Sequence, residues 1–250
     1  MSDETELLKN RFKELARKTE RGYFTFSDFL GLSEQNLFSS VKRDISCPYT
    51  AFGGASGTER IMIRFGDPDE LGYELPFPIK CLKIEPRSAK FAERLTHRDY
   101  LGAILNLGIE RSSVGDIVVK ENLAYVFVKE EIATYVLSEL ARVKHTDVIL
   151  CEAEDILEGE LYRTQTKNVQ VASARIDALI ARVFSTSRED AQTLFKKRLV
   201  YLNGEECENT SRALKDGDQV SVRGYGRFIY LGYSNLTKKG RLNASVEIYI

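Results

Sequence analysis

The stretch RIDALIARVFSTSREDAQTLFKKRLVYLNG, residues 175–204, decides the fold of the C-terminal part of this chain. From Ile176 onward, apolar side chains recur at i, i+3, i+4 and i+7, the spacing that buries one face of a helix. Ser187 followed three residues later by Asp190 is typical of the N-terminal cap of a second helix. Residues 200–202 then indicate a strand, and Asn203-Gly204 a tight turn. We therefore expect two short helices followed by a strand and a turn.

The second helix combines an apolar face with a basic face. Ala191, Leu194 and Phe195 lie on the side expected to be buried, and polar side chains recur every four residues on the other side. More cations follow at the helix end, where they oppose the negative end of the helix dipole. A solvated helix face explains these cations, and so does a surface that binds RNA phosphates. On the second helix and its end these residues are Arg188, Gln192, Lys196, Lys197 and Arg198; Arg175 and Arg182, seven residues apart, share a face of the first helix.

The distribution of charge favours a polyanionic partner. The 250-residue chain has a formal net charge of −1, but residues 169–250 hold 13 basic and 9 acidic residues, a net charge of +4. A second basic cluster in this region is interleaved with aromatic residues. Cations supply phosphate contacts and aromatic rings stack on unpaired bases. The cluster consists of Arg223, Tyr225, Arg227, Phe228, Tyr230, Tyr233, Lys238, Lys239 and Arg241.

Several motifs in the chain resemble known RNA-binding sequences. Four of them resemble the S4-type RNA-binding module: R-I-D-x-L-I at 175–180, S-R-x-x-A-x-x-L at 187–194, V-Y-L-N-G at 200–204 and L-K-x-G-D-x-V-S-V at 214–222. Three others are similar to the YlmH family of bacterial RNA-binding proteins: R-G-Y-G-R-F at 223–228, T-K-K-G-R at 237–241 and L-T-H-R-D-Y-L-G-A-I-L at 95–105. The resemblance covers most of the chain and is looser before residue 50.

This resemblance implies a function. A member of the YlmH family is expected to bind ribosomal RNA or tRNA, to associate with the large ribosomal subunit, and to act in translation quality control by rescuing obstructed subunits that carry peptidyl-tRNA. Ribosome assembly and a role linked to cell division are alternatives. Phosphate contacts would set register and orientation without reading bases. The expected RNA-binding residues are Arg175, Arg182, Ser187, Arg188, Gln192, Lys196, Lys197, Arg198, Arg223, Arg227, Lys238, Lys239 and Arg241.

One residue departs from the family pattern. The S4-type module usually has glycine just after its second helix, where this chain has Arg198. Glycine is favoured there because the left-handed conformation costs it no Cβ clash. Arg198 must therefore bear a strain of about 1 kcal/mol, or the helix must end differently.

The preceding sequence predicts an α+β, multi-domain organisation. Residues 1–72 are expected to form an N-terminal α+β domain, beginning with a helix whose apolar stripe is Leu7, Leu8, Phe12 and Leu15. Shorter helical pieces are expected at 28–32 and 34–41, and a hairpin at 48–52 and 61–65, around a glycine-rich turn. Arg60 and Arg64 beside this turn are further candidates for RNA contact. Asp67, Pro68, Asp69 and Gly72 mark a loop and the first boundary.

Residues 73–157 are expected to form a ferredoxin-like domain. The pattern predicts strands at 79–85, 116–120, 123–129 and 147–152 and helices at 94–107 and 130–143, which is the βαββαβ order. Tyr125 and Phe127 share one strand face; we expect them under a helix, and base stacking is the alternative. A polar linker at 158–168 leads to the S4-type domain at 169–250, which ends in a β-hairpin.

Other classes of protein are disfavoured. No apolar run approaches the roughly 20 residues of a membrane span, and the first 18 residues lack the apolar centre of a signal peptide. The four cysteines lie far apart, which indicates reduced thiols in the cytoplasm and no zinc site. The glycine-rich turn at 53–58 lacks the lysine of a phosphate-binding loop. We expect no metal, no cofactor, no membrane or DNA partner, and a monomer.

The triplet His97-Arg98-Asp99 imitates the catalytic loop of protein kinases. That loop needs asparagine five residues after the aspartate, where this chain has Ile104. Thr96 and Asp99 fit a capping box that opens a helix. His97 and Arg98 would then lie near a positive helix end and are candidates for a secondary RNA contact, with a structural role as the alternative.

Two classes of function follow. The first is a non-catalytic RNA-binding protein, because no base and nucleophile are paired in a recognisable setting. The second is an RNA-modifying enzyme, because similar modules are appended to pseudouridine synthases and to some methyltransferases. Neither a catalytic aspartate in a synthase setting nor a glycine-rich nucleotide loop is found before residue 169. We therefore expect no catalytic residues.

Overall fold

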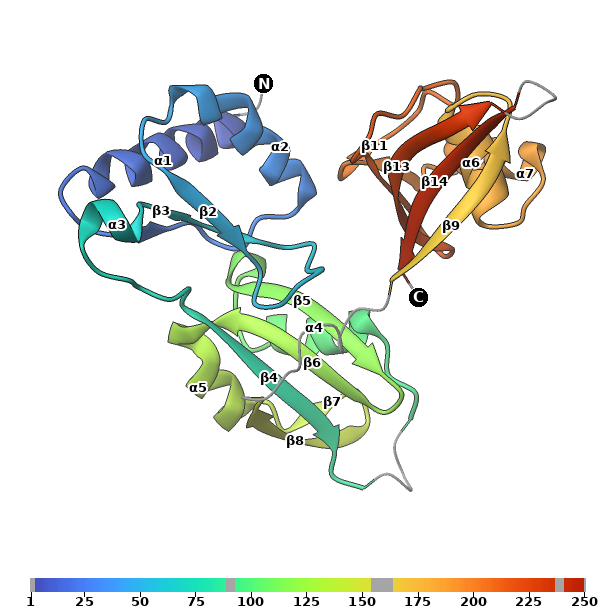
Figure 1. Cartoon of the computed structure of the whole chain (residues 1–250). Coiled ribbons are helices and arrows are strands. Elements are labelled where there is room, and N and C mark those ends of the chain that lie inside the picture. The colour runs from blue at the N-terminus through green and yellow to red at the C-terminus, as the bar shows by residue number, and fades with distance from the viewer. Residues whose placement is uncertain (1–2, 89–92, 154–163, 237–240, 250) are drawn as a thin grey trace. The chain divides into compact units, whose positions relative to one another are not determined.

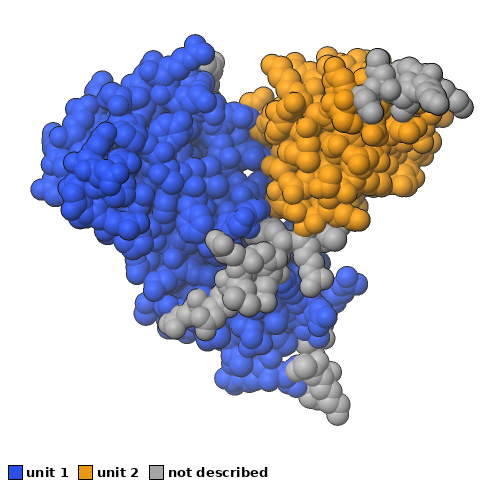
Figure 2. All heavy atoms as spheres, viewed as in Figure 1, with its two compact units in different colours: residues 1–161 blue, residues 162–250 orange. Residues whose placement is uncertain are grey.

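The structure is a computed structural model that describes residues 3–88, 93–153, 164–236 and 241–249 (Figure 1). It is a mixed α and β protein with three antiparallel sheets. The chain divides into two compact units, residues 1–161 and 162–250 (Figure 2). Within the described ranges, no helix has the length and apolar character needed to cross a bilayer.

The first part of unit 1 packs two helices on a small sheet with the strand order β1–β3–β2. Phe38 lies at the centre of its core, with its ring edge-on to Phe12 at 5.2 Å and to Phe65 at 6.0 Å between centroids. The expected hairpin at 48–52 and 61–65 is confirmed, because β2 and β3 pair antiparallel. The elements are α1 (Asp3–Thr19), β1 (Thr25–Phe26), α2 (Leu32–Val41), η1 (Lys42–Asp44), β2 (Tyr49–Phe52), β3 (Met62–Phe65) and α3 (Pro68–Leu71).

Two expectations for this part are wrong. Leu7 does not belong to the buried stripe and is 68% exposed. It precedes Leu8 by one residue, which is about 100° around the helix, so only Leu8 shares the face of Phe12. Residues 28–32 form no separate helix; Leu30 bridges to Ile61 instead, and α2 begins at Leu32.

The second part of unit 1 has the expected order of strand, helix, two strands, helix and strand. Its five-stranded sheet has the order β5–β6–β4–β8–β7. Tyr100 and Ile104 of α4 and Val136 of α5 pack with Leu82 and Val126 on one face of the sheet. The elements are β4 (Ile79–Pro86), α4 (His97–Leu105), η3 (Arg111–Ser113), β5 (Val114–Lys120), β6 (Leu123–Lys129), α5 (Glu130–Glu139), β7 (Arg142–Val143) and β8 (Thr146–Glu152).

Two expectations change here as well. The second helix was expected to reach residue 143, but α5 ends at Glu139, and Arg142 and Val143 form β7, which pairs with β8. Phe127 is buried, yet not under a helix: alternation along β6 turns Ala124, Val126 and Val128 toward the helices and Phe127 away from them. Gly54 of the glycine-rich turn lies so close to its ring that a Cβ there would overlap it, and a Cβ at Gly115 would meet the Phe29 ring at 2.8 Å and the Phe127 Cβ at 3.0 Å.

Unit 2 is a six-stranded sheet with the order β11–β10–β12–β13–β14–β9, and α6 and α7 pack on one face. β14 and β9 pair in unbroken register from Leu242↔Val171 to Tyr249↔Thr164. Residues 164–168, expected in a linker, are therefore part of a strand. The elements are β9 (Thr164–Val171), α6 (Ile176–Val183), α7 (Arg188–Lys196), β10 (Val200–Leu202), β11 (Glu205–Glu206), β12 (Gln219–Val222), β13 (Gly226–Leu236) and β14 (Leu242–Tyr249).

Candidate nucleic-acid interface

The turn between α6 and α7 is fixed by hydrogen bonds at both helix ends. Two residues after α6, Ser185 adopts the left-handed conformation at φ 55°, and the Thr186 amide donates to the Ala181 carbonyl at 2.9 Å. The Ser187 hydroxyl accepts from the Asp190 amide at 2.9 Å, as the sequence predicts for a capped helix. Side chains at the start of α7 therefore have defined positions next to α6.

Asp177 draws two of the expected RNA-binding residues together. Its carboxylate has no exposed surface and accepts hydrogen bonds from Arg175 at 3.0 and 3.1 Å and from Arg188 at 3.2 and 3.3 Å. Burial raises the pKa of Asp177, but hydrogen bonds from Arg175 and the charge of Arg188 outweigh it, so the net pKa is lowered. The guanidinium groups of these two side chains, which are 33% and 57% exposed, are thus held by one ionised carboxylate.

The C-terminal end of α7 carries the remaining cations of this face. Lys196, Lys197 and Arg198 are exposed, and Gln192 is half-buried. Arg198 does bear the left-handed conformation, with φ 56°. Its amide donates to the Phe195 carbonyl at 2.9 Å and the Leu199 amide to the Leu194 carbonyl at 3.0 Å, which is the hydrogen-bond pattern of a glycine-terminated helix. Its guanidinium lies 3.4 Å from Glu206.

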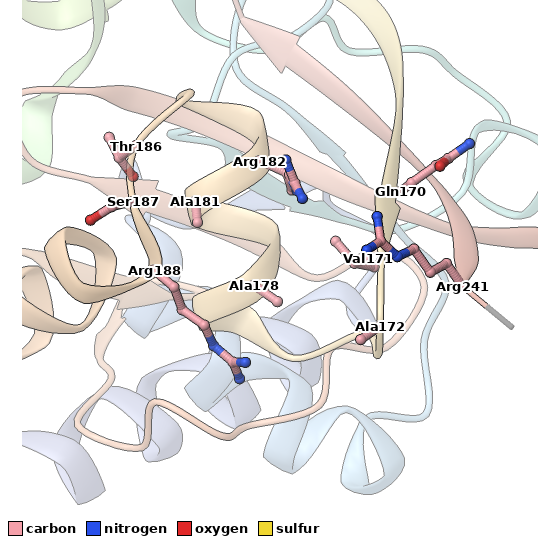
Figure 3. A pocket seen from close by; sticks show the side chains of 10 residues that line it. All are labelled: Gln170, Val171, Ala172, Ala178, Ala181, Arg182, Thr186, Ser187, Arg188 and Arg241. Atoms are coloured by element: carbon pink, nitrogen blue, oxygen red, sulfur yellow. The ribbon is translucent and has the colours of Figure 1, made fainter. Parts of the chain in front are cut away.

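A hollow of about 370 Å³ lies beside this face, between α6, the start of α7 and the end of β9 (Figure 3). Arg182 of α6 and Arg188 of α7 lie on its rim together with Arg241, which precedes β14. None of the lining residues that the structure describes is acidic. They are Gln170, Val171, Ala172, Ala178, Ala181, Arg182, Thr186, Ser187, Arg188 and Arg241.

Arg241 is the member of the second basic cluster that lies beside this surface, whereas Arg223 and Arg227 do not extend it. Ser221 and Arg227 alternate with Val220 and Phe228, which face the helices, so Arg227 lies on the opposite face of the sheet. Arg227 lies over the ring of Tyr249, with the guanidinium carbon 3.9 Å from the centroid. Arg223 lies in the same way over Tyr201, at 4.5 Å. The expected residues of unit 2 therefore fall on two faces.

The aromatic residues of this cluster divide by exposure. Tyr225 and Tyr233 are 48% and 60% exposed and can meet a base. Phe228 and Tyr230 are buried in the core, so the expectation that they stack on bases is wrong. Tyr201 and Tyr249, which support the two arginines, were missed because their partners lie 22 residues away along the chain in both cases. Lys238 and Lys239 lie outside the described residues.

In unit 1, the capping box that opens α4 is present. The Thr96 amide donates to Asp99 at 2.7 Å, and Lys144 forms an ion pair with Asp99 at 2.9 Å. Hydrogen bonds from Lys144 and Thr96 lower the pKa of Asp99 to about 2. His97 and Arg98 lie in the first turn and are exposed. Desolvation and the charge of Arg111 lower the pKa of His97, which favours a neutral imidazole.

Arg60 and Arg64 are not placed to contact RNA. Arg60 donates to the carbonyls of Phe29 at 2.7 Å and Val114 at 3.0 Å. Arg64 is 8% exposed, donates to the Leu75 carbonyl at 2.7 Å and lies over two phenylalanine rings. Both guanidinium groups are thus engaged with backbone carbonyls or aromatic rings of the protein, and the suggestion that they meet RNA is corrected.

Other chemistry has little support in the described part of the chain. No group of three or more histidine, cysteine or acidic side chains there could hold a metal ion. The four cysteines form no disulfide. Burial raises the pKa of Cys81 to about 12, so this thiol is protonated and a poor nucleophile.

Comparison with known proteins shows which proteins this chain resembles. Residues 74–156 match the family model described as "Putative RNA-binding domain in YlmH", which places the chain among proteins with an RNA-binding domain. Over this segment the chain is therefore similar to the YlmH family. It is 28% identical over 230 residues to a Bacillus subtilis (strain 168) protein named ribosome-associated protein quality control protein P2, covering 88% of this chain and 86% of that protein.

A solved structure is also similar. It is the cell division protein ylmH from Streptococcus pneumoniae, with 25% sequence identity and a TM-score of 0.48. The match covers 61% of this chain and 93% of the solved chain.

Proposed function

We propose that this chain is a non-catalytic RNA-binding protein that docks on structured RNA of the large ribosomal subunit and acts in translation quality control. The observation that carries the proposal is the basic surface of α7 and its neighbours, where Asp177 orients Arg175 and Arg188 at the start of α7 and Lys196 and Lys197 are exposed at its end. Paired guanidinium groups suit RNA phosphates because each presents a planar set of donors to two oxygens. The name of the Bacillus subtilis relative supports the ribosome as the partner.

The proposal assigns different contacts to the two domains. Residues 73–157 would form a ferredoxin-like domain, supported by the strand order β5–β6–β4–β8, and residues 169–250 an S4-type domain. His97 and Arg98 would give the former a secondary contact with RNA or protein. Further RNA contacts of the S4-type domain would come from Arg223, Arg227 and Arg241. The protein would act as a monomer in the cytoplasm, where ribosomes are found, without a cofactor.

Binding to purified large ribosomal subunits across a salt series tests this proposal. Replacing Arg188, Lys196 and Lys197 with alanine should weaken binding and reduce the slope of log K against log salt by nearly one for each phosphate that the variant no longer neutralises. A variant with only Lys196→Ala and Lys197→Ala leaves the Asp177 cluster intact and should show up to two-thirds of this change in slope.

The control is a variant in which the same amount of charge is removed elsewhere. Arg11, Lys18 and Arg142 form exposed ion pairs in unit 1, and their replacement with alanine should leave the salt slope unchanged. If a folded Arg188/Lys196/Lys197 variant kept the affinity and the salt slope of wild type, the proposed surface would not be the RNA-binding surface. Analysis of modified nucleosides after incubation with ribosomal RNA tests the alternative, an RNA-modifying enzyme.

A further inference from the structure

The hollow beside α6 differs in shape and lining from an ordinary phosphate contact. Its floor comes from Val171 and Ala172 at the end of β9 and from Ala178 and Ala181 on α6 (Figure 3). Three of these four side chains are single methyl groups, so the floor is apolar and leaves room above it. A volume of about 370 Å³ is near the lower end of the range for ligand sites, which suits one nucleotide.

The rim of the hollow is cationic. Arg182, Arg188 and Arg241 line it, and no described residue of the lining carries a negative charge. Arg188 is held from behind by Asp177 through its Nε and one Nη. A guanidinium fixed in this way can bind a phosphate with a smaller cost in side-chain entropy than a mobile lysine. The rim therefore fits the phosphate that adjoins a nucleotide in the hollow.

Two observations call for a base in addition to a phosphate. The alanine floor gains nothing from a phosphate, because apolar surface is stabilised only when another apolar surface covers it. The Thr186 hydroxyl, which lines the hollow, is buried and has no hydrogen-bond partner in the described part of the chain. Such a group calls for a polar partner, and the edge of a base can supply one.

We propose that this hollow holds one unpaired nucleotide of the bound RNA, with its base on the alanine floor and its phosphate on the arginine rim. The inference rests on the proposed RNA-binding function and adds the structural element that is recognised: a bulge or loop rather than a continuous duplex. Unpaired nucleotides expose the base face and edges that a protein pocket can bind.

The test compares three RNA hairpins by fluorescence anisotropy with the full chain. The first is fully paired, the second has a single-nucleotide bulge, and the third has the same bulge without a base. Wild type should bind the bulged hairpin about tenfold more tightly than the other two, in line with the usual contribution of one stacked base. The abasic hairpin separates the base from the added flexibility of a bulge.

Two variants fill the hollow without changing its charge. Ala178→Leu projects from α6, where leucine is well tolerated in a helix, and Ala172→Leu projects from an exposed position at the end of β9. Both should abolish the tenfold preference for the bulge and keep wild-type affinity for the paired hairpin. The control is Ala103→Leu on α4 of unit 1, which should behave as wild type.

The outcomes separate the two proposals. Equal affinity of wild type for all three hairpins, or a preference that survives both filled variants, overturns the nucleotide site and leaves the proposed function standing. Failure of wild type to bind any hairpin or the large subunit overturns the proposed function itself.

Discussion

Arginines in the two units have opposite roles, although both groups lie beside turns and were candidates for RNA contact on sequence grounds. In unit 1, Arg60 and Arg64 direct their guanidinium groups at backbone carbonyls and phenylalanine rings. In unit 2, Arg182 and Arg188 lie on the rim of an open hollow. Arg188 is 57% exposed, and the carboxylate of Asp177 holds only one side of its guanidinium.

The difference lies in the acceptors rather than in the arginines. Arg60 meets the carbonyls of Phe29 and Val114, which would be deprived of this donor if it turned to solvent. Arg188 meets an acid, which fixes its position and leaves its outer edge for another anion. Whether an arginine stabilises the fold or binds a ligand is therefore decided by the groups that surround it.

The largest expected effect on stability comes from Arg60→Ala. This variant removes charged hydrogen bonds to backbone carbonyls and leaves those carbonyls unsatisfied, so the free energy of unfolding should fall by about 2–4 kcal/mol. Affinity for the large ribosomal subunit should not change under conditions where the variant is folded. Denaturant titration of the full chain and subunit binding measure the two quantities.

Arg142→Ala is the matched control for Arg60→Ala. Arg142 pairs with Asp147 in an exposed position, so its removal should cost less than about 1 kcal/mol. If Arg60→Ala were as mild as this control and weakened RNA binding instead, the contrast between the two units would be wrong.

An intermediate effect is expected from Asp177→Asn. The amide keeps the shape but not the charge, so the free energy of unfolding at pH 7 should fall by about 1–2 kcal/mol, less than for a fully buried pair because both arginines are partly exposed. RNA affinity should fall about fivefold, because Arg175 and Arg188 no longer share an anionic anchor.

The same substitution makes a prediction about pH. Because the folded-state pKa of Asp177 is lowered, its contribution to stability is complete above about pH 4 and is lost as the pH falls from there toward the folded-state pKa. The free energy of unfolding of Asp177→Asn should therefore fall less than that of wild type between pH 5 and pH 3. Glu206→Gln, which breaks the single exposed pair with Arg198, is the control and should leave RNA affinity within about twofold of wild type.

Local patterns predicted local structure well. The apolar stripe of α6 is buried at all four positions from Ile176 to Val183, and Ser187 caps α7. These features depend on residues three to seven positions apart, whose side-chain preferences are visible in the sequence. The order of strands and helices from β4 to β8 in unit 1 could be predicted for the same reason.

Features that depend on distant partners were not predicted. Residues 164–168 are polar on both faces, and only pairing with β14, from Asn168↔Ser245 to Thr164↔Tyr249, makes them a strand. The carbonyl acceptors of Arg60 lie 31 and 54 residues away along the chain. The hollow beside α6 joins three separate segments, so no single motif describes it.

The smallest effect, and the only gain, is expected at Arg198. Its φ of 56° costs a residue with a Cβ about 1 kcal/mol, so Arg198→Gly should raise the free energy of unfolding by about 0.5–1 kcal/mol after the entropy that glycine adds to the unfolded chain. Arg198→Ala keeps the strain and should give no gain. The salt slope for subunit binding shows whether Arg198 also binds RNA. Both variants should lower this slope by about one if Arg198 contacts a phosphate. An unchanged slope would place Arg198 with Arg60, among the arginines whose partner lies within the protein, because Glu206 already lies 3.4 Å from its guanidinium.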